Sequence, residues 1–589
     1  MSTAEAAPRV SDPVELALTS NRLRAVVRKM SNTLFRTGRS GVLNTARDFS
    51  CAIVTADHRL LMTADSLPIH VMSGPDLMSR SLAEFHPTLR RGDAFLHNSP
   101  YHGNSHAADH SLLAPIVDAD GTHRFTVLVK AHQADCGNSQ PTTYMSDAAD
   151  VYNEGALIFP AVQIQRDYED IADIVRMCEA RIRVPSQWRG DYLGMLGAAR
   201  IGERELGALG EELGWDALLG LCEQWFDYSE WRMASAIRAL PGGEAHAESR
   251  HDPVPGVPDG IPIQADIRVE PEDASVEIDL RDNPDCVPCG LNLTESTART
   301  AAYVGVFNSV GTSVPANHGS FRRIRVHLRE NCVAGIPRHP ASASVATTGV
   351  ADRVTNCVQR AFASLGDGAG MAEAGALIPP AGGVISGRDP RTAKPFVNQI
   401  ILTVTGGAGG PRSDGWLTLA HVGNGGMLMR DSVEVDELAY PIRIEATRLL
   451  TDTEGPGRRR GTPSAYVEYG PVDCVLHVAY GSDGTAQLAR GARGGGDGPL
   501  AEQYRRKQDG SLEPLPAVGV PAIQPGETIV SISTGGAGYG DPFERDVELV
   551  AHDVRERWLT PDRAASVYGV AVDEKGVVDA DATRKLRAR

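Results

Sequence analysis

Apolar residues near the start of the chain recur at the spacing of an α-helix. Asp12 and Pro13 provide an N-cap and a first helical residue, and the pattern ends at Gly38. The apolar positions between them are Leu23, Val26, Val27, Met30 and Leu34. This pattern predicts one amphipathic helix, about 25 residues long, whose apolar stripe faces the core or a subunit interface. The residues before it, 1–11, are expected to form a disordered lead-in.

Two apolar runs, residues 112–117 and 125–129, flank a short polar turn and predict a β-hairpin. In such a hairpin the numbers of paired residues sum to about 241, so Asp109 lies roughly opposite His132. His106 comes three residues before Asp109. We therefore expect a carboxylate and two imidazoles to converge at the open end of this hairpin.

Further strands and helices alternate along the chain. An earlier hairpin is predicted from residues 52–54 and 60–62 around a turn at 56–58. Helical spacing follows at residues 171–182 and 192–237. Later strands are predicted at residues 263–269, 275–280, 324–328, 398–404, 439–449, 465–468, 474–479 and 528–533, with helices at 298–309 and 353–365. The mixture predicts the α+β fold class.

Breaks in composition divide this α+β fold into three parts. A proline-rich segment, residues 251–262, is the predicted boundary between a first part and a strand-rich part with glycine-rich loops. The predicted parts are residues 12–250, with a helical block at 167–240, then residues 251–545, and a helical tail at 546–589. Pro561 is expected to start the final helix of the tail.

Composition and charge narrow the range of partners. The chain has 589 residues, of which 42% are apolar, and its formal charge is −17 with a pI of about 5.5. Such an acidic surface repels phosphate backbones and anionic lipids, so we expect neither a nucleic-acid nor a membrane partner. No apolar run approaches the roughly 20 residues of a spanning helix, and residues 1–10 lack a signal core. We expect a cytoplasmic protein.

No motif in the sequence supports nucleotide binding or nucleophilic catalysis. Residues 534–542, TGGAGYGDP, carry the glycines of a nucleotide loop, but no helix starts there and no Lys-Ser/Thr follows. We interpret them as a tight turn near a subunit boundary that binds no ATP. The nine scattered cysteines fit reduced thiols, and the single CxxC pair, Cys286 and Cys289, reads as turn or core residues. No GxSxG motif or Cys–His pairing supports a nucleophilic hydrolase.

The hairpin mouth has the ligand types of a catalytic metal site. His106, Asp109 and His132 would offer two imidazole nitrogens and one carboxylate oxygen to Zn²⁺ or Mn²⁺, with positions open for water or substrate. The alternative is that these histidines, among seventeen in the chain, are surface residues. Asp135 would be a fourth ligand or would orient an imidazole. Weaker candidates, for which ion-pair or hydrogen-bond roles are the alternative, are Asp48, His70, His102 and His110.

Several motifs, in one order, resemble the hydantoinase B/oxoprolinase family. They are Arg47-Asp48-Phe49-Ser50-Cys51-Ala52, Leu67-Pro68-Ile69-His70, His106-Ala107-Ala108-Asp109, Ala131-His132-Gln133-Ala134-Asp135, Glu154-Gly155, Arg200-Ile201-Gly202-Glu203-Arg204, Asp227-Tyr228-Ser229-Glu230, Tyr440-Pro441-Ile442-Arg443 and residues 535–542. The resemblance covers nearly the whole chain, residues 12–572.

The resemblance implies a multi-subunit ATP-dependent enzyme. In it, a partner of the hydantoinase A type, with an actin-like ATPase fold, binds ATP and phosphorylates a small carbonyl substrate. Members open cyclic amides such as hydantoins, oxoproline and lactams, while relatives carboxylate ketones such as acetone and acetophenone. In the ketone carboxylases the matching residues hold a metal ion, and the resemblance implies the same role for His106, Asp109 and His132. A small third subunit would favour carboxylation.

The sequence departs from the family pattern at three places, which leave the substrate open. Gln133 stands where a second adjacent histidine is usual. Residues 44–46, NTA, replace a charged triplet, and residues 317–319, NHG, lack the acidic residue usual before the glycine.

Three hypotheses remain open from the sequence. The first is a metal-bearing subunit that completes hydrolysis of an ATP-activated cyclic amide, with Asp135 orienting a ligand and Asp48 or His70 as acid/base. The second keeps this site but joins bicarbonate or carboxyphosphate to a ketone-derived enolate. The third is a non-catalytic scaffold for the ATPase partner, with structural histidines.

Overall fold

The structure, a computed structural model, describes residues 12–64, 66–311, 313–375, 379–403, 406–417, 419 and 421–588. The chain divides into two units. The first comprises residues 1–143, 148–244 and 267–347, and the second comprises residues 144–147, 245–266 and 348–589. The predicted lead-in, residues 1–11, lies outside the described residues. The division into three parts inferred from composition stays a prediction.

Helices and sheets occur throughout, which confirms the α+β class. The first unit holds helices α1 Pro13–Thr37, α2 Gly41–Asn44, α3 Pro68–Val71, α4 Pro75–Phe85, α5 Val151–Glu154, α6 Ala172–Arg181, α7 Pro185–Leu213, α8 Trp215–Ile237, α9 Glu295–Val310 and α10 His318–Phe321. Its strands are β1 Phe49–Thr55, β2 Leu60–Thr63, β3 Ala94–His97, β4 Asp109–Val117, β5 His123–His132, β6 Val162–Arg166, β7 Glu169–Asp170, β10 Ser275–Asp279 and β11 Ile324–His327.

The remaining elements complete the chain. Strands β8 Gly243–His251 and β9 Ile261–Glu270 contain residues of both units. The second unit holds helices α11 Val350–Leu365, α12 Val433–Ala439, α13 Val547–Arg555, α14 Pro561–Tyr568 and α15 Ala580–Arg587, with short 3-10 turns at Pro380–Gly382, Val422–Asn424 and Pro542–Glu544. Its strands are β12 Val384–Arg388, β13 Pro395–Gln399, β14 Ile442–Leu449, β15 Ala465–Pro471, β16 Leu476–Gly481, β17 Glu502–Arg506, β18 Leu512–Pro514, β19 Val518–Gly519, β20 Ala522–Ile523 and β21 Thr528–Ile532.

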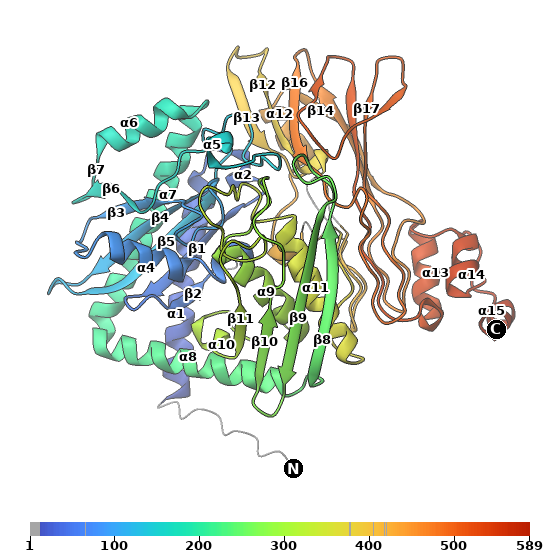
Figure 1. The fold of residues 1–589 in the computed structure, drawn as a ribbon, viewed down its shortest axis with the longest axis horizontal. Helices are drawn as coiled ribbons and strands as arrows, with labels where there is room; N and C mark the ends of the chain where they lie inside the picture. The colour runs from blue at the N-terminus through green and yellow to red at the C-terminus, as the bar shows by residue number, and fades with distance from the viewer. Residues whose placement is uncertain are drawn as a thin grey trace. The chain divides into compact units, whose positions relative to one another are not determined.

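A seven-stranded antiparallel sheet forms the centre of the first unit. Its order is β2-β1-β5-β4-β3-β6-β7, so β4 and β5 lie in its interior. Helices α1 and α7 pack side by side against one face (Figure 1). Leu112 and Val129 belong to the core on that face, whereas their neighbours Leu113 and Leu128 belong to the core with α3 and α4. Because both faces are covered, the strands carry continuous apolar runs.

The predicted register of the central hairpin is confirmed. The pairs from Asp109–His132 to Ile116–Phe125 follow one antiparallel register, and a shift occurs only next to the turn. The earlier predicted hairpin is confirmed as β1 and β2, which also pair antiparallel.

The predicted first helix is confirmed as α1. The Asp12 carboxylate accepts hydrogen bonds from the backbone N–H groups of Val14, at 2.8 Å, and Glu15, at 3.3 Å, and Gly38 ends the helix. The whole predicted apolar stripe lies in the core of the first unit, so the core interpretation holds rather than a subunit interface.

Two helical predictions differ from the structure. The helical segment predicted at 192–237 begins earlier, at the start of α7. It forms two helices, because Gly214, at φ 81°, separates α7 from α8. Glycine adopts this left-handed backbone without a steric penalty. Pro561 starts α14, but the prediction that this is the final helix is wrong, since α15 follows. Among the described residues, no helix combines the length and apolar character needed to cross a membrane.

Three sheets lie beyond the first. Their orders are β11-β10-β9-β8, then β13-β12-β16-β19 with β20 also pairing with β16, and β14-β15-β21-β17-β18. The strand predicted at residues 398–404 is displaced, because β13 ends at Gln399 and Val404 lies outside the described residues. Strand β8 was not predicted, since its sequence, GEAHAESRH, contains no apolar run.

The glycine-rich segment 534–542 packs against other glycine-rich segments of the second unit. A Cβ atom on Gly536 would lie 1.9 Å from the carbonyl oxygen of Gly407, and one on Gly461 would lie 1.8 Å from that of Gly536. The predicted turn is confirmed at the end of this segment, where Gly540 has φ 76° and the 3-10 turn Pro542–Glu544 follows Asp541. Its place near a subunit boundary stays a prediction. The other glycines allow backbones to approach more closely than any side chain would permit.

We expect the α1 stripe to stabilise the first unit. Replacing Leu23, which is 1% exposed, by alanine should lower the free energy of unfolding by about 2–5 kcal/mol, because a cavity replaces packed methyl groups. The matched control is Leu18→Ala on the same helix, where the side chain is 61% exposed. Urea denaturation should show a large shift only for the first variant, and equal shifts would contradict this packing.

Candidate metal centre

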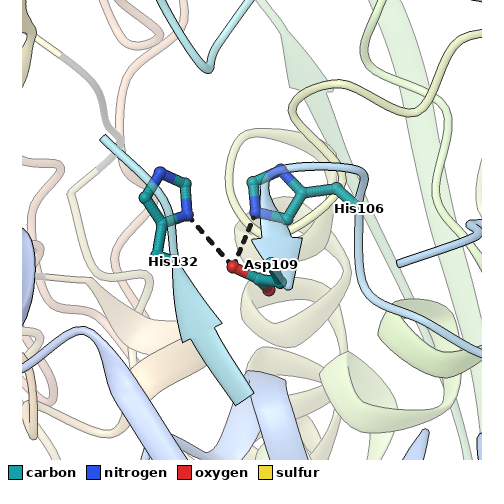
Figure 2. A group of neighbouring side chains, drawn as sticks. All are labelled: His106, Asp109 and His132. Atoms are coloured by element: carbon teal, nitrogen blue, oxygen red, sulfur yellow. Dashed lines mark hydrogen bonds and ion pairs between the residues drawn. The ribbon is translucent and has the colours of Figure 1, made fainter. Parts of the chain in front are cut away.

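The ends of β4 and β5 bring the predicted ligands together. Asp109 is the first residue of β4 and His132 the last residue of β5, and the two are paired across the hairpin. His106 lies in the turn before β4, and its backbone carbonyl accepts a hydrogen bond from the Asp109 backbone N–H at 3.2 Å. Figure 2 shows both imidazoles directed at the Asp109 carboxylate. The structure therefore assembles all three residues at the predicted place.

One carboxylate oxygen connects the three side chains. Asp109 Oδ1 lies 3.0 Å from His106 Nε2 and 3.0 Å from His132 Nδ1. The two imidazole rings are stacked, with centroids 5.1 Å apart. At most 1% of each residue is exposed, so the alternative that these histidines are surface residues is wrong.

The charges of the three groups depend on one another. Burial lowers the pKa of His106, but the Asp109 carboxylate and a hydrogen bond to Ser344 outweigh burial, so the pKa lies above its ordinary value. Burial also raises the pKa of Asp109, but the imidazoles of His106 and His70 outweigh it and hold the pKa well below its usual range. Asp109 is therefore ionised at neutral pH and available as a ligand.

Neighbouring polar groups fix the orientation of each ligand. His106 Nδ1 donates to the carbonyl of Ser344 at 2.8 Å, which leaves the lone pair on Nε2. His132 Nε2 lies 3.0 Å from the Thr143 hydroxyl. The Ser105 hydroxyl donates to Asp109 Oδ2 and accepts from Lys130 Nζ at 3.1 Å.

Sequence reasoning missed these orienting groups. Lys130 could have been found, because it interrupts an apolar run two residues before His132 and so faces the same side of β5. Burial lowers its pKa to about 8. Ser344 carried no signal, since it is 238 residues from His106 in the chain.

The structure brings the acid/base candidates Asp48 and His70 to the same carboxylate. His70 Nε2 lies 3.2 Å from Asp109 Oδ2 and 3.5 Å from Asp48 Oδ1. The Ser50 hydroxyl lies 3.3 Å from His70 Nδ1. A proton on His70 Nε2 would therefore be shared between two carboxylates.

The other candidates make contacts elsewhere. Asp135 accepts from the Arg183 guanidinium at 3.0 Å and from the backbone N–H of Gly137 at 3.1 Å, and no imidazole contact is shown for it within the described residues. His110 accepts from the indole N–H of Trp188 at 3.3 Å, and burial lowers its pKa to about 3. His102 contacts the Ser99 hydroxyl at 2.8 Å. For His102 and His110 the structure gives the predicted hydrogen-bond alternative.

The donor set fits a divalent metal ion. His106, Asp109 and His132 offer donor atoms that all lie within 4.8 Å of one another. Ligands about 2.0–2.2 Å from a tetrahedral or octahedral centre are themselves separated by about 2.8–3.6 Å. The two 3.0 Å separations from Asp109 Oδ1 match this spacing. Two imidazoles and one carboxylate suit Zn²⁺ or Mn²⁺ and leave positions for water or substrate.

Comparison with known proteins identifies similar chains over the full length. A family model described as hydantoinase B/oxoprolinase matches residues 12–542. Caprolactamase subunit beta of Pseudomonas jessenii is 28% identical, over 98% of this chain and 99% of the relative. The acetophenone carboxylase delta subunit of Aromatoleum aromaticum is 23% identical, over 98% and 89%. The crystal structure of the ATP-dependent caprolactamase from P. jessenii superposes with a TM-score of 0.89 at 25% identity, covering 98% of this chain and 100% of that one.

We expect metal binding at this centre to weaken as the pH falls. A metal ion requires the unprotonated His106 Nε2. Because the pKa of His106 is raised above its ordinary value of 6.5, protons begin to compete with the metal ion for this nitrogen at a pH higher than 6.5. The rise in melting temperature that Zn²⁺ or Mn²⁺ produces should shrink from pH 8.5 to pH 6. In the metal-free chain the dependence of stability on pH has the opposite sign. The contribution of the His106–Asp109 pair to folding stability is fully present below the unfolded pKa of His106 and is lost as the pH rises through its folded pKa. A metal effect independent of pH would contradict ligation by His106.

Proposed function

The chain belongs to the hydantoinase B/oxoprolinase family, and we propose that it is the metal-bearing subunit of an ATP-dependent enzyme that hydrolyses a cyclic amide. The observation that carries this proposal is the buried cluster of His106, Asp109 and His132, with all donor atoms within 4.8 Å. The similarity to caprolactamase subunit beta over 98% of the chain supports an amide of the lactam type as substrate.

The residues of this chain have separate roles in the proposed reaction. His106 Nε2, Asp109 Oδ1 and His132 Nδ1 would hold a metal ion, which when bound would polarise a substrate oxygen or lower the pKa of water to about 7. His70 would be the acid/base residue, because its Nε2 lies 3.5 Å from Asp48 Oδ1 and 3.2 Å from Asp109 Oδ2. Asp135, predicted to orient a ligand, would instead hold the segment after β5 in place through its contact with Arg183.

ATP would be bound by a separate subunit. The glycine-rich segment 534–542 of this chain is packed by other backbones and leads into the three-residue turn Pro542–Glu544 rather than the long helix of a phosphate loop. A hydantoinase A-type ATPase would therefore phosphorylate the carbonyl compound and pass it to this site. We propose a hetero-oligomer on this basis, which the subunit names of the relatives support.

Carboxylation of a ketone is the second candidate function. It is favoured by the similarity to the acetophenone carboxylase delta subunit over 98% of this chain. The same metal centre would then orient a ketone-derived enolate towards a carboxyl donor made from bicarbonate, and a small third subunit would be expected.

We expect activity to require both the ATPase partner and the three ligands. With the co-purified partner and ATP, the complex should release phosphate and open lactams, hydantoins or oxoproline without bicarbonate. His106→Ala and His132→Ala should lower the rate by more than about 100-fold. The control is His327→Ala, which alters a 39% exposed histidine of the same unit.

Each other outcome identifies another function. Product formed only with a ketone and bicarbonate would support the carboxylase. Full activity of both ligand variants would support the third hypothesis, a scaffold with structural histidines, and would overturn the proposed site.

A further inference from the structure

We propose that Glu154 is a positioning residue for the metal ligand His106, acting through the segment Ser342–Ser344. The proposal rests on the proposed function, since it requires that His106 binds a metal ion. None of these residues except His106 belongs to the ligand set, and the charge of His106 acts on the Glu154 carboxyl.

The contact that Glu154 would secure is the one that orients His106. The imidazole Nδ1 of His106 donates to the Ser344 carbonyl at 2.8 Å. This hydrogen bond keeps the proton on Nδ1 and turns Nε2 towards Asp109 Oδ1. A displacement of the Ser344 carbonyl would rotate the ring or free the other tautomer, and either would weaken the metal site.

A chain of hydrogen bonds leads from Ser344 to Glu154. The backbone N–H of Ser344 donates to the Ser342 hydroxyl at 3.3 Å, and this hydroxyl donates to Glu154 Oε2 at 2.7 Å. All three residues are at least nine-tenths buried. Because water has little access, the loss of one bond leaves the next group unpaired, and the segment must move to recover a partner.

Glu154 itself is held by the short helix α5. Asp150 caps this helix by accepting from the Asn153 N–H at 2.8 Å, and Gly155 ends it in the left-handed conformation at φ 75°. The Val151 N–H donates to the carbonyl of Pro340 at 3.0 Å, so α5 contacts the segment before Ser342 as well. Helix α5 is thus fixed at both of its ends, and this fixes the position of Glu154.

A second group also holds the same segment. Asn292, which is fully buried, donates to the Ser342 carbonyl at 2.9 Å. The Val345 N–H donates to the carbonyl of Gly290 at 2.8 Å. With Asn292 fixing the backbone, the Glu154 carboxyl fixes the Ser342 hydroxyl, which accepts from the Ser344 amide, and it also hydrogen-bonds the Ser344 side chain.

A carboxyl at this place is costly unless it performs such a task. Within the described residues Glu154 has no ion-pair partner, and burial raises its pKa above the ordinary value. An apolar side chain of the same size would avoid the desolvation penalty. The Glu154-Gly155 pair also belongs to the motifs through which the sequence resembles its family, and the ligand set leaves it unexplained.

The test compares metal affinity among variants of the full chain, measured by competition with a chelator. Glu154→Leu and Ser342→Ala should each raise the metal dissociation constant about 10–100-fold. Glu154→Gln keeps an acceptor oxygen for the Ser342 hydroxyl and should stay within about 3-fold of the unmodified chain. This rescue distinguishes positioning from a need for charge.

A matched control removes an equally buried serine that is not part of this chain of contacts. Ser229 is fully buried, donates to the Trp225 carbonyl at 2.8 Å and accepts from Asn317 at 2.9 Å. Ser229→Ala should lower the melting temperature of the metal-free protein without changing the metal dissociation constant. If Glu154→Leu fails to fold, Ser342→Ala carries the comparison.

The outcomes separate this inference from the proposed function. Unchanged metal affinity in both Glu154→Leu and Ser342→Ala overturns the inference alone. Equal weakening by Ser229→Ala also overturns it, since the effect would then reflect general destabilisation. An unmodified chain that binds no more metal than His106→Ala overturns the metal centre and the inference with it.

Discussion

The register of the β4/β5 hairpin is the constraint on which the candidate site depends. Because Asp109 is paired with His132, their side chains lie on one face at the open end of the hairpin. Side chains alternate between the faces of a sheet, so a slip of one residue would move one of them to the opposite face. The hydrophobic cores on both faces oppose such a slip, since Leu112, Ala114 and Ile116 belong to one core and Leu113 to the other. The apolar residues of the hairpin therefore determine the geometry of its polar end.

The polar end is stable because its groups satisfy one another. A buried carboxylate without partners would cost several kcal/mol, yet Asp109 contacts His106, His132, His70 and the Ser105 hydroxyl. Each imidazole has a second polar contact, and these contacts select which nitrogen faces Asp109. The cluster is accordingly prearranged for a cation and requires little reorganisation to bind one.

Local patterns in the sequence predicted most of what is local in the structure. Helix α1 followed from its N-cap and apolar stripe, and both hairpins followed from runs that flank polar turns. The meeting of Asp109 and His132 followed from the register alone, and His106 from its distance of three residues. Prediction failed where contacts between residues far apart in the sequence determine the structure. Ser344 and Glu154 come to the site from far along the chain, Asp135 is drawn away by Arg183, and the glycines at 534–542 serve packing between segments that no single stretch reveals.

The proposed site requires a metal ion between three named atoms, and crystallographic anomalous scattering tests this directly. Crystals of the complex, measured on both sides of the zinc or manganese absorption edge, should show one anomalous peak about 2.0–2.2 Å from His106 Nε2, Asp109 Oδ1 and His132 Nδ1. A map with ordered side chains at this centre and no peak, or with the peak at other residues, would contradict the proposed metal site.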